Sequence, residues 1–342
     1  MTWNRADGRR ADEAPLEVAC DESGSDGENL VGGNTDVFAH AGVALPIRAA
    51  EVFVQEIRDR IRSPAEEYKA NHLLREKHRA VLEWLLAPAG PLAGRARVHL
   101  TQKAYFVVEQ AVRLLLGDGD RAARALFRAG PGAFGDACWQ EFLGAANRLL
   151  RVRYDGDPRT PVAEFYRVVE RMREAEDAAG SPDVPARLAE TRSRAEAYRD
   201  RLLDGPPLVP VLNPLLPAIV RTAASWSDDG RPVLLVHDRQ NMLTEDRIAW
   251  IVAAARRRGA GLTGLRLVAA RQDARVQLAD FLAGVARKIA SDELNGHGDP
   301  VLTALLRPFV AAESVWGDEE SWSRLGPGTE IPGVPARLNF AV

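Results

Sequence analysis

The chain has 342 residues, a hydrophobic content of 46% and a formal net charge of −3. It can bury a substantial core in one large domain or two smaller ones, which excludes an intrinsically disordered chain. The two cysteines, Cys20 and Cys138, are too few for a disulfide framework and lack metal-ligand spacing. The slight acidity argues against a nucleic-acid enzyme, although arginine runs such as 256–258 allow a local basic surface.

Residues 1–14 are polar and charged, with no apolar segment of the kind found in signal peptides. No stretch of the chain approaches the length of a membrane span. We therefore expect a disordered leader over 1–14, no membrane partner and a cytoplasmic location.

The first predicted strand covers residues 16–24, where Leu16, Val18 and Cys20 alternate with more polar positions. Asp21 lies on the other face, near the carboxyl end of the strand. A second strand over 36–45 follows a glycine-rich connection, so the two are expected to form an antiparallel hairpin. This connection is longer than a tight turn, and we expect it to be mobile and to lie over a site.

Residues 15–118 are predicted to form the first part of an α/β core. After the hairpin we expect a helix over 48–62, a helix start at 63–66, a helix over 75–86, a strand over 97–101 and an apolar helix over 104–116. The helix start places Glu67 and Lys69 near a helix amino terminus. After residue 118 the predicted α/β core is interrupted by an insertion.

Residues 119–230 are predicted to form a helical insertion and a linker. The segment 121–203 has helical periodicity, broken only near prolines and glycines, and a proline-rich connection and a short helix follow. The charge pattern of 186–203 is typical of an exposed amphipathic helix. This insertion is therefore expected to pack or to bind a partner protein rather than to catalyse a reaction.

Residues 231–295 are predicted to form the second part of the core. The continuous apolar run 233–236 indicates a central strand covered on both faces, with His237 and Asp238 at its carboxyl end. His237 should point to the face opposite Asp238, which indicates a structural role. A helix over 245–258, capped by Thr244, and a strand over 262–270 follow.

The helix predicted over 273–291 carries Asp280 beside an apolar stripe that includes Leu278 and Phe281. A carboxylate in that position loses hydration unless a cation or an arginine is near. Asp21, Asp238 and Asp280, all at the ends of core elements, therefore suggest a divalent-metal site. Taken singly, Asp21 and Asp238 could equally be turn residues. Residues 296–342, a C-terminal helix and tail, show no recognisable chemistry.

Four segments carry a resemblance to a known family. They are DESGSDGENLVGGNTDVFAHAGVAL at 21–45, EYKANHLL at 67–74, VLLVHD at 233–238 and VQLADFLAGVARK at 276–288. Over residues 16–116 and 231–291 the chain resembles, in the same order, the family catalogued as domain of unknown function 3800. The resemblance implies an α/β ribonuclease H-like fold, with a mixed sheet flanked by helices and interrupted here by the all-α insertion.

In that fold, carboxylates from the first strand, a following segment, the fourth strand and a late helix bind two divalent cations. The resemblance implies Asp21, Glu67, Asp238 and Asp280 in these roles, with Lys69 as an alternative to Glu67. Carboxylate oxygens suit Mg²⁺ or Mn²⁺. Two such ions, about 3.5 to 4 Å apart, stabilise the attacking water and the leaving oxygen of a phosphodiester. We therefore expect a nuclease acting on RNA or DNA.

Four side chains are expected to contact the substrate. They are Ser23, Lys69, Lys103 and Gln277. Solvated surface lysines are the alternative for Lys69 and Lys103, and a hydrogen bond to the backbone is the alternative for Gln277. Two other functions stay open: a catalytically inactive scaffold or sensor that binds a partner through the helical insertion, and a phosphohydrolase acting on free nucleotides.

Overall fold

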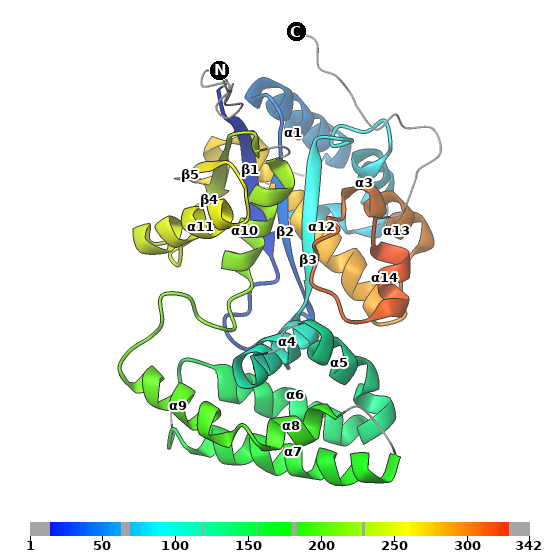
Figure 1. The fold of residues 1–342 in the computed structure, drawn as a ribbon. Helices are drawn as coiled ribbons and strands as arrows, with labels where there is room; N and C mark the ends of the chain where they lie inside the picture. The colour runs from blue at the N-terminus through cyan, green and yellow to red at the C-terminus, as the bar shows by residue number, and fades with distance from the viewer. Residues whose placement is uncertain are drawn as a thin grey trace, which may run out of the picture.

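The computed structural model describes residues 14–62, 69–117, 120–154, 156–179, 183–227 and 230–327. They form an α/β part with a central sheet and, at one end of that sheet, a helical module, which Figure 1 shows beneath it. The predicted leader lies outside the described residues except for Ala14, and the predicted helix start at 63–66 and Glu67 also lie outside them.

The described residues form one mixed sheet of five strands in the order β3-β2-β1-β4-β5. The strands are β1 (Leu16–Ser23), β2 (Val37–Val43), β3 (Ala96–Gln102), β4 (Val233–Asp238) and β5 (Leu262–Val268). Antiparallel pairing joins β3, β2 and β1, whereas β1, β4 and β5 pair in parallel. The α/β class with a mixed sheet is confirmed, as is the antiparallel hairpin of β1 and β2.

Helices cover both faces of the sheet. One face packs against α10 (Leu215–Trp226) and α11 (Glu245–Arg257), with Val18 and Cys20 of β1 in the shared core. The other face packs against α12 (Ala274–Leu294), which crosses β1 and β2. Around α12 lie α1 (Ile47–Ile61), α2 (Ala70–Leu73), a 3₁₀ turn (Glu76–His78), α3 (Arg79–Leu86), α13 (Pro300–Leu306) and α14 (Glu319–Leu325).

The helical module has its own hydrophobic core, rich in aromatic side chains. Its helices are α4 (Lys103–Leu116), α5 (Asp120–Phe134), α6 (Asp136–Leu150), α7 (Thr160–Ala179), α8 (Val184–Ala189) and α9 (Arg192–Leu203). The predicted domain boundary at 119 separates α4 from the helices it packs against, and the boundary at 230 separates α10 from the sheet that it covers. By packing, the inserted module therefore begins at α4 and ends before α10.

The segment after α13 runs along the outer strand β3. Val310 and Val315 form isolated bridges with Val98 and Thr101. No sequence pattern predicted this contact, which covers an edge that would otherwise expose unpaired backbone groups. Among the described residues, no helix has the length and apolar character needed to cross a membrane.

Candidate carboxylate site

Asp21 and Asp238 lie side by side at the carboxyl ends of two parallel strands. Cys20 of β1 is in register with His237 of β4, so the following residues, Asp21 and Asp238, share the opposite face. Two positions earlier on each strand, Ala19 and Val236 pack with Val276 of α12. Both aspartates therefore lie on the face that α12 covers, as the alternation of the first strand predicted.

Asp280 lies on α12, one turn after Val276, and completes a group with Asp21, Asp238 and Glu22 that we call the carboxylate cluster. Burial, followed by the charges of Glu22, Asp280 and Asp238, raises the pKa of Asp21 to about 9, against one backbone hydrogen bond that lowers it. Burial, Asp238 and Asp280 also raise the pKa of Glu22, to about 7. Asp238 and Asp280 are thus close enough to Asp21 and Glu22 to oppose the ionisation of those two carboxyl groups.

Backbone N–H groups donate to two of these aspartates. Asp21 accepts from the backbone N–H of Glu22 at 2.8 Å, and Asp238 accepts from that of Ala270 at 2.9 Å. Glu22 Oε2 is buried without a hydrogen-bond partner in the described part of the chain, and it lies 3.7 Å from His237 Nε2. A buried carboxylate oxygen without a donor is costly, and a bound cation would remove that cost.

No group of three or more His, Cys, Asp or Glu side chains that could hold a metal ion is found within the described residues. Glu67, the fourth carboxylate that the resemblance implies, lies outside them. The donors that are described fit Mg²⁺ or Mn²⁺ in chemistry, because they are hard carboxylate oxygens. Their mutual repulsion and the partnerless Glu22 Oε2 are features that a divalent cation would relieve.

Three of the expected substrate contacts have other roles or positions in this structure. Ser23 Oγ accepts a hydrogen bond from Arg287 Nε at 3.1 Å. Gln277 Nε2 donates to the carbonyl of Ala270 at 3.2 Å, which is the backbone alternative; Ala270 also holds Asp238. Lys69 is exposed at the amino terminus of α2.

Lys103 is not a solvated surface lysine, contrary to the alternative considered above. Its side chain is fully buried, and its ammonium group forms an ion pair with Asp26 and donates to the hydroxyl and the carbonyl of Thr35. Asn147 of α6 accepts from the backbone N–H groups of Leu30 and Val31. The β1–β2 loop (residues 24–36) is thus fastened at several points, which argues against the mobility expected from its glycine content.

Two residues that the sequence analysis did not select belong to the site, Glu22 and Arg287. Arg287 follows Asp280 by seven residues, so both lie on the same side of α12. It also lines a cavity of about 620 Å³ between the β1–β2 loop, α5, α6 and α12. Helical spacing from Asp280 could have identified Arg287, and the position of Glu22 directly after Asp21 could have identified Glu22.

A chain of hydrogen bonds on the other face fixes the backbone at Asp238. His237 Nδ1 lies 2.8 Å from the carbonyl oxygen of Asp238, which can only accept, so Nδ1 carries the proton. His237 Nε2 then accepts from Nε2 of His40 at 3.2 Å, and Nδ1 of His40 accepts from the Thr222 hydroxyl at 2.8 Å. Burial lowers the pKa of both histidines, which keeps them neutral. His237 has the structural position that was predicted for it.

Comparisons of this chain with protein-family models, with curated proteins and with solved structures gave no match. The family resemblance therefore stays a prediction, and a functional assignment rests on the carboxylate cluster.

Proposed function

We propose that this protein is a divalent-metal-dependent nuclease that hydrolyses phosphodiester bonds, on a ribonuclease H-like core. The observation that carries the proposal is the gathering of Asp21, Glu22, Asp238 and Asp280 at one end of β1 and β4, where the charges of Asp238 and Asp280 help to raise the pKa of Asp21 and of Glu22. Buried carboxylates whose pKa is raised by neighbouring carboxylates are candidates for a functional site. The first strand, the fourth strand and a late helix are also the elements that the family resemblance implies.

Asp21, Asp238 and Asp280 would hold Mg²⁺ or Mn²⁺, together with Glu67 if its segment approaches them, and Glu22 offers a further oxygen. Such ions, when bound, supply an activated water and neutralise charge on a phosphate group. The chain contributes positioning. The Ala270 N–H orients the carboxylate of Asp238, and His237 orients its carbonyl from the other face.

The substrate proposed is a nucleic acid, RNA or DNA, and its support is the cavity beside the cluster. Arg287 lies between the carboxylate cluster and the cavity, because it donates a hydrogen bond to Ser23 at the end of β1 and also lines the cavity. A guanidinium group is suited to bind a phosphate oxygen. Asp36 also lines this cavity, so among the described residues Arg287 is a single cationic contact in a lining that is neutral overall.

The test is cleavage of labelled RNA and DNA with Mn²⁺, with Mg²⁺ or with EDTA, comparing wild type, Asp238→Asn and Asp246→Asn. Asp246 is exposed in the first turn of α11, so its variant is a matched control. We expect cleavage that requires metal, that persists in Asp246→Asn and that falls at least about 100-fold in Asp238→Asn, the scale of losing a precisely placed catalytic group.

Equal cleavage by all three proteins would refute the assignment of the carboxylate cluster as the catalytic site. No cleavage by the wild type, together with no stabilisation by either metal, would refute the nuclease proposal. That outcome would favour the scaffold alternative, with the helical module as the binding surface.

A further inference from the structure

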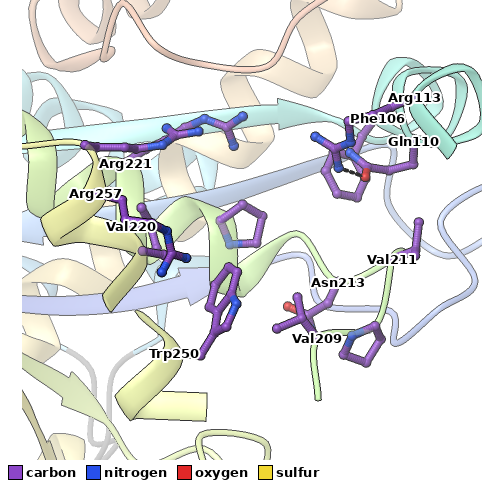
Figure 2. Close-up of a pocket in the computed structure, with 14 residues that line it drawn as sticks. Phe106, Gln110, Arg113, Val209, Val211, Asn213, Val220, Arg221, Trp250 and Arg257 are labelled. Carbon is purple, nitrogen blue, oxygen red and sulfur yellow. Dashed lines mark hydrogen bonds between the residues drawn. The ribbon is translucent and has the colours of Figure 1, made fainter. Parts of the chain in front are cut away.

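A second cavity lies on the sheet face opposite the carboxylate cluster. It has a volume of about 400 Å³ and is enclosed by α4, α10, α11 and the connection 209–213 (Figure 2). This volume is within the range of small-molecule sites. Neither the carboxylate cluster nor the family resemblance accounts for it.

The cavity gathers four guanidinium groups, from Arg113, Arg221, Arg257 and Arg258. Figure 2 shows Arg221 and Arg257 on one side and Arg113 across from them, hydrogen-bonded to the neutral amide of Gln110. Within the described residues, no hydrogen bond or ion pair joins the side chain of Arg221, Arg257 or Arg258 to another residue. Arg221 is half-buried and Arg113, Arg257 and Arg258 are exposed, so the cations converge around a partly open cavity.

Arg221 lies near both positive and negative charges. Burial lowers its pKa, Arg258 and Arg113 lower it further, and the opposing charges come from Glu109 and Asp120. Glu109 lies outside the cavity lining, so its carboxylate does not occupy the space between the arginines. An anionic ligand in the cavity would offset the repulsion that Arg258 and Arg113 exert on Arg221.

An aromatic surface lies next to the cations. Trp250 of α11 and Phe106 of α4 line the same cavity, and Figure 2 places Trp250 below Arg257 and facing the open space. Tryptophan stacks with planar ring systems, and arginine binds phosphate oxygens through two parallel N–H groups. An anionic ligand that also carries a planar ring could bind the arginines through its charge and stack on the aromatic side chains through its ring.

We propose that this cavity binds a nucleoside phosphate, with the phosphate group against Arg221 and Arg257 and the base against Trp250. The site is separate from the carboxylate cluster, since α10 and α11 cover the face opposite α12. It is independent of the proposed nuclease activity.

The experiment measures binding of adenosine 5′-monophosphate, adenosine and inorganic phosphate by calorimetry and by thermal melting, in EDTA. The proteins are wild type, Arg221→Gln, Trp250→Leu and Arg256→Gln. Arg256 is an exposed neighbour of Arg257 that does not line the cavity, so it is the matched control. We expect the monophosphate to bind wild type and Arg256→Gln alike, at least about tenfold more weakly to Arg221→Gln, and more weakly to Trp250→Leu.

Arg221→Gln should also melt no lower than wild type without ligand, because it removes a cation that its neighbours repel. A lower melting temperature would indicate a structural arginine and overturn the proposal. Absence of monophosphate binding to the wild type, or phosphate binding as tight as the monophosphate, would also overturn it. A loss of monophosphate affinity in Arg256→Gln equal to that in Arg221→Gln would likewise overturn the proposal.

An Asp238→Asn variant separates the two sites. In EDTA it should bind the monophosphate as wild type does, whatever its effect on cleavage. Loss of binding in this variant would place the nucleotide at the carboxylate cluster and remove the second site.

Discussion

At the scale of single residues, three histidines meet on the sheet face that α10 covers. His40 and His237 have hydrogen-bond partners, whereas both ring nitrogens of His99 are buried without a partner in the described part of the chain. Burial lowers the pKa of His99 to about 3, and the charge of Arg221 acts in the same direction. His99 is therefore neutral in the folded protein at any pH where the protein is expected to be stable.

This predicts an acid-dependent loss of stability. The folded pKa of His99 lies below the ordinary value of 6.5, so below pH 6.5 the unfolded chain binds a proton that the folded chain does not. The free energy of unfolding therefore decreases as the pH falls from 6.5 towards 3. The contribution of His99 to this decrease is up to about 1.4 kcal/mol per pH unit. His99→Leu should lose less stability than wild type between pH 6.5 and 4.5 in denaturant titrations. Parallel pH profiles for both proteins would contradict this.

Lys103 and Asp26 form a pair whose two members are buried to different extents. The side chain of Lys103 is 0% exposed and that of Asp26 is 14% exposed. Asp26→Asn leaves a fully buried ammonium group without its counter-charge, which typically costs about 3 to 5 kcal/mol. Lys103→Met removes the charge and keeps much of the apolar chain, so it should cost less. Chemical denaturation of both variants tests this order, and a larger loss for Lys103→Met would show that the unpaired buried ammonium group is not the main cost.

At the scale of elements, α12 is the helix that assembles the carboxylate cluster. Val276, Asp280, Gly284 and Arg287 follow one another at helical spacing along one side of it. A Cβ atom at Gly284 would lie 2.3 Å from Cβ of Ala70. The glycine therefore allows α12 and α2 to approach closely.

Gly284→Ala should consequently destabilise the protein, although alanine is the better helix former by up to about 1 kcal/mol. The steric overlap requires α12 or α2 to move, and such overpacking costs about 1 to 3 kcal/mol. Gly144→Ala on α6 is the matched control, because its added Cβ would meet only the end of the Arg148 side chain, at 3.3 Å. Thermal melting should show a loss for Gly284→Ala and none for Gly144→Ala. Equal effects would show that this helix contact is not tight.

The elements of the site could be predicted from the sequence because each has a strong pattern. The alternation of β1, the apolar run of β4 and the apolar stripe of α12 are local signals. The burial of Lys103 could not be predicted, because it depends on Asp26 and Thr35, which are remote in the chain. The position of α4 could not be predicted either. Its apolar character indicates that it is buried, but not that it packs in the helical module.

At the scale of the whole molecule, the helical module contacts the α/β part beside the carboxylate cluster. The β1–β2 loop connects the two, because Asn147 of α6 bonds its backbone and Lys103 of α4 bonds its side chains. The cavity next to Arg287 has walls from both parts. The module therefore helps to shape the proposed substrate site, so a variant in α5 or α6 can alter substrate preference without touching a carboxylate.

The stability of the whole protein should depend on the charge of the carboxylate cluster. The folded pKa of Asp21, about 9, lies above its ordinary value of 3.8. Between these values the unfolded chain releases a proton that the folded chain keeps, so stability falls as the pH rises from 4 to 9. Asp21→Asn removes this penalty, since the amide is uncharged and similar in shape. In EDTA at pH 7 the variant should melt several degrees higher than wild type.

Added Mn²⁺ should reverse the order of the melting temperatures of wild type and Asp21→Asn. A cation that binds only the folded state raises the melting temperature, and Asp21→Asn removes one of the oxygens proposed to hold it. Wild type should therefore gain stability with Mn²⁺, whereas the variant gains little, and Asp246→Asn should follow wild type in both solutions. A variant that melts lower than wild type in EDTA would mean that the Asp21 carboxylate stabilises the free protein. The repulsion that supports a metal site would then be absent.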